Sequence, residues 1–219
     1  MTYIDYFKLK EEITVFLRNA DIFTTTNRGV TTTTAGGTFT ATSSLLIAKS
    51  DVRNIRSIVV AGVTLTYGED YQTDYYYLST TRQTNITFTT AQTGIYVVTY
   101  DYGTDKIYPD FPQTSLSVSD FPRIGVDLVG VQTQSAGLGN VNRSNVLFTV
   151  VMYSTSKTEL LNLMTSVRSK FIDAVTGFYY VGRWVKPGST GPLIVGERGK
   201  DKVFQQNVDF EAPLRYEIN

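Results

Sequence analysis

A β-rich segment interrupts this chain of 219 residues between two parts that each look too small to fold alone. One amphipathic helical pattern precedes the segment, and strand patterns with a second helical pattern follow it. We therefore expect one discontinuous domain, formed by residues 1–35 and 104–219, and an inserted domain at residues 36–103. A domain inserted into a loop keeps its own ends close together, so the two parts can fold as separate units.

The first helix is predicted over residues 3–18. Its apolar residues recur at spacings of three and four, which places them on one stripe: Tyr6, Leu9, Ile13, Phe16 and Leu17. The charged residues fall largely off this stripe: Lys8, Lys10, Glu11, Glu12 and Arg18. Residues 19–37 are rich in Thr and end at a Gly pair, so we expect an extended linker or an edge strand.

The insert at residues 36–103 is expected to contain only strands. Val63, Leu65 and Tyr67 alternate in the way that strand residues do, and no helical period is visible. Turn signals recur every 8–12 residues, for example at Ala61-Gly62 and at residues 68–70. Short strands at this spacing indicate a small antiparallel sandwich or barrel.

The part after the insert is predicted to alternate strands with one helix. Residues 124–128 form a strand, and the nearly continuous apolar run at residues 146–153 predicts a strand buried on both faces. Ser156 and Glu159 form a capping box before a helix that stops at Gly177. Further strands are expected at residues 178–185, 203–209 and 214–218, with a Gly/Pro-rich loop at residues 186–201. The fold class is therefore α+β, with a mixed or antiparallel sheet flanked by two helices and an inserted all-β domain.

Composition argues against several classes of function. The chain has no His and no Cys, and its 20 basic and 20 acidic side chains give a formal net charge of zero. These features exclude disulfides, thiolate metal sites and His-based acid–base catalysis. A neutral chain with no long apolar run does not point to a nucleic-acid or membrane partner. We predict a structural protein, not an enzyme, with no cofactor.

The acidic residues do not form a recognisable site. Glu69, Asp70 and Asp74 could bind Ca²⁺, but their spacing fits no EF-hand loop and a solvated turn is favoured. Asp120, Asp127 and Glu197 lie nearest the apolar strands, yet the sequence does not show that any two face each other. We therefore predict no catalytic, metal-binding or cofactor-binding residue.

Two groups of residues are candidates for contacts with partners. Tyr71, Tyr75 and Tyr77 could form a binding face on the insert, although cross-strand packing within a small sheet is the favoured interpretation. The basic residues of the C-terminal Gly-rich region could contact an acidic neighbouring subunit, the alternative being a solvated hairpin tip. These basic residues are Arg183, Lys186, Arg198, Lys200 and Lys202.

The outer domain resembles the tail-terminator, or tail-completion, proteins of long-tailed bacteriophages. The resemblance covers about two-thirds of the chain and rests on the order of its parts. These are a first helix, the segment Asp120-Phe121-Pro122-Arg123-Ile124 that opens a strand, the apolar strand at 146–153, the capped helix from Ser156 and the closing segment 208–217. The insert resembles the β domains that decorate phage tail proteins, and it is a departure from the simpler terminator pattern.

The resemblance implies a structural role in the virion. Subunits would assemble in the host cytoplasm into a ring, six-fold in the usual case, that caps the tail tube, ends its polymerisation and joins it to the head connector. The implied partners are further copies of the chain, the tail tube protein and the head-connector or neck protein. The alternatives are another neck, tail or head–tail connector protein, or a module that binds a host surface or glycan through the insert.

Overall fold

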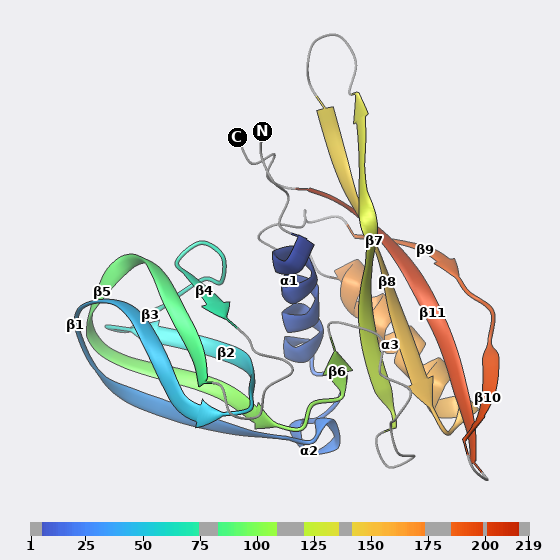
Figure 1. Cartoon of the computed structure of the whole chain (residues 1–219), viewed down its shortest axis with the longest axis horizontal. Coiled ribbons are helices and arrows are strands. Elements are labelled where there is room, and N and C mark those ends of the chain that lie inside the picture. Colours follow the sequence, from blue (N-terminus) through green and yellow to red (C-terminus); the bar gives the residue numbers. More distant parts are fainter. Residues whose placement is uncertain are drawn as a thin grey trace. The chain divides into compact units, whose positions relative to one another are not determined.

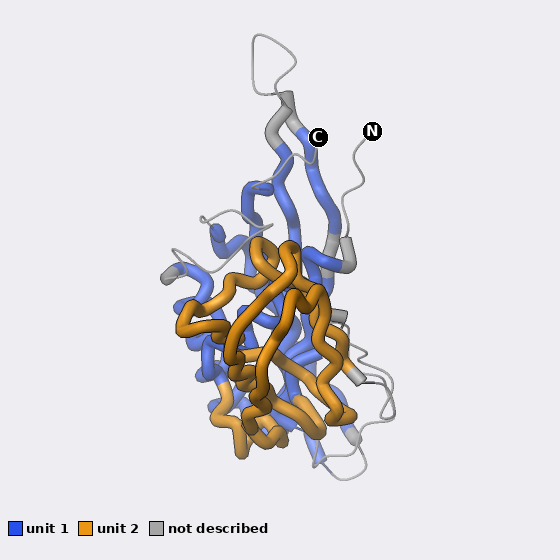
Figure 2. Tube along the Cα trace, turned by 90° about the vertical axis from the view of Figure 1, so that its left-hand side faces the viewer, with its two compact units in different colours: residues 1–22, 106–219 blue, residues 23–105 orange. Residues whose placement is uncertain are grey.

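The structure is a computed structural model that describes residues 6–74, 83–108, 121–135, 142–173, 185–198 and 201–214. It divides into two compact units, which Figure 2 shows in separate colours. The first unit contains residues 1–22 and 106–219, and the second contains residues 23–105. The predicted insert, residues 36–103, lies within the second unit. That unit also takes in residues 23–35 and 104–105, which the sequence assigned to the outer domain.

The described residues form eleven strands and three helices (Figure 1). The sheets are antiparallel or mixed, as predicted, but the chain is richer in β structure than the predicted α+β class with two flanking helices. One reason lies in residues 186–201, predicted to be a loop. They contain strands β9 (Lys186–Thr190) and β10 (Ile194–Arg198), which both pair with β11 (Asp201–Pro213).

The first unit is built on a six-stranded sheet of order β10-β11-β8-β7-β6, with β9 also paired to β11. Strands β7 (Arg123–Ser135) and β8 (Asn142–Ser154) form a long antiparallel hairpin. Strand β6 (Ile107–Tyr108) pairs with β7 in parallel, which makes the sheet mixed. The predicted strands at residues 178–185 and 214–218 lie outside the described residues, apart from Val185 and Leu214.

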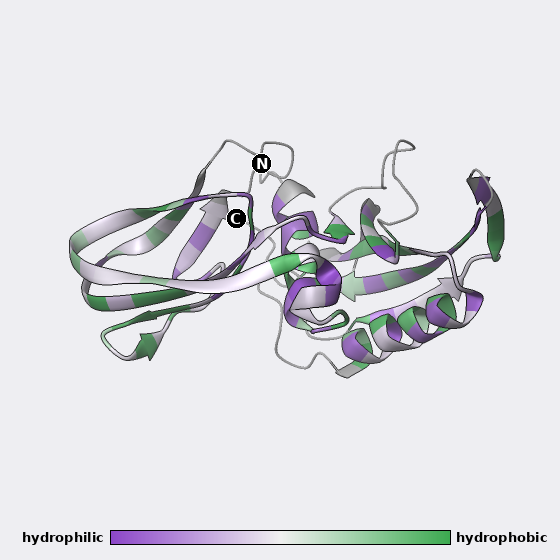
Figure 3. Ribbon diagram, turned by 90° about the horizontal axis from the view of Figure 1, so that it is seen from below, coloured by the Kyte–Doolittle hydropathy of each residue, from purple (hydrophilic) through white to green (hydrophobic). Residues whose placement is uncertain are grey.

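One face of this sheet is apolar and carries the two long helices. Its buried residues alternate along three strands: Ile124, Val126, Phe148, Val150, Met152, Val208, Phe210 and Ala212. Helix α3 (Lys157–Asp173) runs along this face (Figure 3), and the Phe171 ring lies 5.3 Å from Phe148 and 4.6 Å from Phe210 between centroids. Helix α1 (Tyr6–Asn19) joins the same aromatic cluster, because Phe16 lies 5.0 Å from Phe171.

Helix α1 buries more than its apolar stripe. Leu9, Ile13 and Leu17 are buried as expected, and Glu11 and Arg18, predicted to lie off the stripe, are buried as well. Their charged groups have partners within the unit. Glu11 forms an ion pair of 3.2 Å with Lys8, and Arg18 Nη2 donates a hydrogen bond of 2.9 Å to the carbonyl of Ile107. Sequence periodicity alone does not reveal such pairing.

The second unit contains a short helix and a five-stranded antiparallel sheet of order β1-β5-β2-β3, with β4 also paired to β5. Helix α2 spans Thr25–Arg28, and the strands are β1 (Val30–Ser50), β2 (Val52–Val60), β3 (Val63–Thr64), β4 (Tyr71–Asp74) and β5 (Gln83–Gly103). The Thr-rich run before the predicted insert therefore belongs to β1, which is an edge strand of this sheet. The predicted turn at Ala61-Gly62 is confirmed, since both residues have positive φ and link β2 to β3.

Strand β5 folds back on itself, so that one sheet encloses its own core. The Phe39 ring lies 5.3 Å from the ring of Phe88 and 3.9 Å from that of Tyr96, although eight residues of straight strand would span about 27 Å. The bend coincides with register shifts around Thr42, with a positive φ at Ala41 and with a positive φ at Gly94. Several short strands were predicted here, whereas β1 and β5 are 21 residues long and bent.

Candidate functional site: sheet edges and a buried charge cluster

The predicted basic contact loop is not one cluster. Lys186 lies opposite Glu211 on the β9 side of strand β11, and Lys202 lies opposite Glu197 on the β10 side. Nine residues of extended strand separate positions 202 and 211, a distance of about 30 Å. Both lysines are exposed, but they occupy opposite ends of the sheet edge and face acidic residues of their own sheet. The interpretation as one basic patch is wrong for this pair.

Arg183 and Lys200 lie outside the described residues. The backbone of Arg198 ends strand β10 opposite Asp201, and its side chain lies outside the described part of the chain.

Tyr71 is a core residue and not part of a binding face. Its side chain is 4% exposed, and its ring packs edge-on against Tyr67 at 5.7 Å between centroids. Burial, with a smaller contribution from the negative charge of Asp70, raises the pKa of the Tyr71 phenol above its ordinary value. Tyr71 is therefore wrong as a candidate for a surface-binding face, and the favoured interpretation, packing within the sheet, is confirmed for this residue. Tyr75 and Tyr77 lie outside the described residues.

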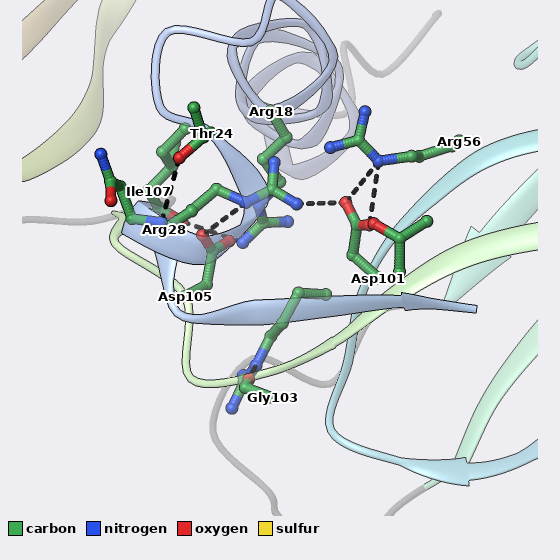
Figure 4. Close-up of polar contacts among 11 residues, drawn as sticks. Arg18, Thr24, Arg28, Arg56, Asp101, Gly103, Asp105 and Ile107 are labelled. Carbon is green, nitrogen blue, oxygen red and sulfur yellow. Dashed lines mark hydrogen bonds and ion pairs between the residues drawn. The ribbon is translucent and has the colours of Figure 1, made fainter.

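A buried charge cluster, which the sequence analysis did not predict, holds one end of the second unit together (Figure 4). Arg28 and Asp101 form an ion pair in which both side chains are almost fully buried. Arg28 Nε also lies 3.4 Å from Asp105, and Arg56 Nε donates to both oxygens of Asp101 at 2.9 Å. The hydroxyl of Thr32 adds a further hydrogen bond of 2.6 Å to Asp101. Two arginines thus face two aspartates, and the charges balance.

Helix α2 positions Arg28 for these contacts. Thr24 caps the helix by accepting a hydrogen bond of 3.2 Å from the amide of Asn27, and Gly29 ends it with φ of 80°. A Cβ at Gly29 would stand 2.7 Å from the carbonyl oxygen of Thr104, which leaves no room for another residue. The one-turn helix therefore fixes where the Arg28 side chain begins and directs it towards strand β5.

The cluster keeps Asp101 ionised. Burial on its own would raise the pKa of this carboxyl group. Hydrogen bonds from Arg56 and Thr32, together with the positive charges of Arg28 and Arg56, outweigh burial and hold the pKa below its ordinary value. A carboxylate held in this state by two guanidinium groups is suited to a structural role and not to proton transfer.

The sequence carries one weak signal for this cluster. Residues 83–100 contain no charged side chain, so Asp101 is the first charge after a long neutral run of strand. A charge at the end of such a strand is expected to have a partner if it is buried. Nothing in the sequence identifies Arg28 and Arg56 as these partners, because they lie 73 and 45 residues away.

The second face of the six-stranded sheet carries a group of polar, half-buried side chains around Asp209. Asp209 accepts hydrogen bonds from Ser189 at 2.5 Å, from Thr149 at 2.8 Å and from Asn207 at 3.2 Å. Burial opposes ionisation of Asp209, but these three hydrogen bonds hold its pKa below the ordinary value. Strands β8, β9 and β11 are thus linked on this face by polar side chains, whereas the opposite face of β8 and β11 carries apolar ones.

The β10 edge of this sheet exposes apolar side chains. Within the described residues, β10 pairs only with β11. Ile194 and Val195 are 50% and 52% exposed. An edge strand that presents unpaired backbone groups and apolar side chains is a template for pairing with another chain. This edge is the feature of the first unit best suited to contact a partner.

Comparison with known proteins gives no family for the chain: no protein-family model matches it, and no curated protein matches it. The described part of the chain contains no group of three or more acidic residues that could hold a metal ion. Among the helices that the structure describes, none is long and apolar enough to cross a membrane.

Proposed function

We propose that the chain is a structural virion protein of the tail-terminator type, whose copies form a ring on the tail tube of a phage. The β10 edge is the observation that carries this proposal. Ile194 and Val195 stand about half exposed on a strand with one pairing partner among the described residues. A subunit that joins this edge to a different surface of the next copy makes a heterologous contact, which gives a ring when the rotation closes.

The order of elements in the first unit supports the same proposal. Helix α1, the β7–β8 hairpin, the capped helix α3 and the closing strand β11 follow one another in the order on which the resemblance to tail terminators rests. The absence of His and Cys from the sequence favours a structural role over a catalytic one. In such a ring the second unit is an added module, since its charge cluster and aromatic core lie within residues 23–105.

The test is the oligomeric state of the purified chain, measured by light scattering and by electron microscopy with and without tail tubes. We expect closed rings or capped tubes for the unmodified chain. Ile194→Lys should shift the population towards monomers, because a charge at the centre of an apolar contact is costly to bury. Leu161→Lys is the matched control, since Leu161 is 47% exposed and belongs to helix α3, not to strand β10.

A chain that stays monomeric at high concentration and binds neither tubes nor connectors would overturn the proposal. Equal loss of assembly in Ile194→Lys and Leu161→Lys would show that the β10 edge is not the contact, whereas rings that survive only in Leu161→Lys would support it.

A further inference from the structure

Arg123 is a buried arginine at the start of strand β7. Its side chain is 4% exposed, and its guanidinium carbon lies 4.0 Å from the centroid of the Tyr108 ring. Tyr108 is on the neighbouring strand β6, and Tyr153 lies directly opposite Arg123 on β8. Residues directly opposite each other share one face of a sheet, so Arg123 and Tyr153 lie on the polar face, away from α3.

Two nitrogen atoms of the Arg123 guanidinium group have no polar partner in the described part of the chain. Its Nε and Nη1 atoms are buried, and neither has a hydrogen-bond partner among the described residues. Stacking on Tyr108 covers the flat face of the group, whereas its N–H bonds point outward in the plane of that group. Lys106 adds positive charge nearby, because its Nζ donates a hydrogen bond of 3.3 Å to the carbonyl of Phe121.

The other buried arginines of the described residues are paired. Arg28 meets the carboxylates of Asp101 and Asp105, and Arg18 donates to the carbonyl of Ile107. A buried charge without a partner strongly destabilises a fold. Within the described residues, Arg123 therefore differs from the two other buried arginines, Arg18 and Arg28.

We propose that Arg123 is an oxyanion-binding residue, which takes a carboxylate or phosphate group from outside the described chain. The planar guanidinium group matches both anions in geometry and charge. Two sources present this chemistry: a free anion, or a carboxylate side chain on a second copy of the chain. The inference goes beyond the ring proposed above and stands without it.

Calorimetric titration of the full chain with inorganic phosphate, at constant ionic strength in chloride, tests the free-anion source. We expect saturable binding of about one phosphate per chain. Arg123→Gln should abolish it, whereas Arg168→Gln, which removes an exposed arginine from helix α3, should leave it unchanged. If Arg123→Gln does not fold, Arg123→Lys keeps the charge but loses the planar donor group, and it should bind phosphate at least about tenfold more weakly.

Light scattering on the same variants tests the second source. If a carboxylate of another copy fills the site, the unmodified chain will not bind phosphate, and its oligomers will dissociate in folded Arg123→Gln or Arg123→Lys but not in Arg168→Gln. The proposal is overturned if phosphate does not bind and the oligomeric state is the same in all variants. It is also overturned if phosphate binds equally well to the Arg123 variants.

Discussion

Arg56 Nε donates hydrogen bonds to both carboxylate oxygens of Asp101, each at 2.9 Å. This contact joins strand β2 to strand β5. Arg28 of helix α2 forms an ion pair with the same carboxylate. Because Thr32 of β1 also donates to this carboxylate, Asp101 connects four elements of the second unit: α2, β1, β2 and β5. Its removal is the most direct test of what holds that unit together.

Asp101→Asn is predicted to destabilise the second unit by about 3–5 kcal/mol, because it leaves the buried Arg28 and the half-buried Arg56 without their shared carboxylate. Urea denaturation followed by circular dichroism measures the free energy of unfolding. Asp127→Asn is the control. Asp127 is a half-exposed residue 3.8 Å from Lys10, and its loss should cost no more than about 1 kcal/mol. Equal effects of the two substitutions would contradict the role given to the cluster.

The free energy of unfolding should decrease in acid because of Asp101. The pKa of Asp101 lies below its ordinary value in the folded chain, so the folded state binds the proton less readily than the unfolded state. The stabilisation is fully present above the unfolded pKa of about 3.9 and is lost as the pH falls through the folded pKa. We expect the free energy of unfolding to decrease below about pH 4, and to decrease less steeply in Asp101→Asn. If the free energy of unfolding decreases equally with pH in the unmodified chain and in Asp101→Asn, this explanation is ruled out.

Phe39→Ala should cost about 3–5 kcal/mol, because it removes the ring that lies between the two halves of the bent strand β5. Ile95→Ala is the matched control on the same sheet. Ile95 is 71% exposed, and its truncation should change the free energy of unfolding by less than about 0.5 kcal/mol. Chemical denaturation of both variants gives the comparison, and a small effect at Phe39 would argue against an enclosed core.

Replacing residues 23–105 by a short Gly/Ser linker should leave the first unit folded. The hydrogen bond of 2.9 Å from Arg18 to Ile107 shows that the chain enters and leaves the second unit at nearby points. Replacing only residues 36–103 should give a less stable and less soluble protein, because the start of β1 would lose its partner β5. Thermal melting and solubility measurements on the two deletion variants show whether residues 23–105 or residues 36–103 are the better bounds of the second unit. If the first deletion unfolds the chain, the division into two units is incorrect.

The sequence predicted well those elements whose signals are local. The capping box at Ser156 is present in part, because the amide of Glu159 donates to the Ser156 hydroxyl at 3.4 Å. The Glu159 carboxylate reaches the hydroxyl of Ser154 instead of the Ser156 amide, and that amide donates to Ser154 at 2.9 Å. Ser154, two residues before the cap, thus bridges the Glu159 carboxylate and the Ser156 amide.

The errors arose where distant residues decide the structure. Strand β8 was predicted to be buried on both faces, yet on the face away from α3 only Val151 is buried, whereas Leu147, Thr149 and Tyr153 are half-buried and Thr149 donates a hydrogen bond to Asp209. The bend of β5 depends on a bulge opposite Thr42, and periodicity within β5 does not show it. The charge cluster joins residues up to 73 positions apart, so composition and spacing could not assemble it.

Strand pairing in the second unit sets the order in which it can form during synthesis. Val30 pairs with Gly103, so the first residues of β1 wait for 73 further residues before their partner leaves the ribosome. At about 5–20 residues per second, this delay lasts several seconds. The waiting segment is rich in threonine, and most of its side chains stay exposed in the finished sheet. A nascent strand of this composition remains soluble while its backbone is unpaired, and the β1–β5 ribbon is completed only after residue 103 of the 219 has been translated.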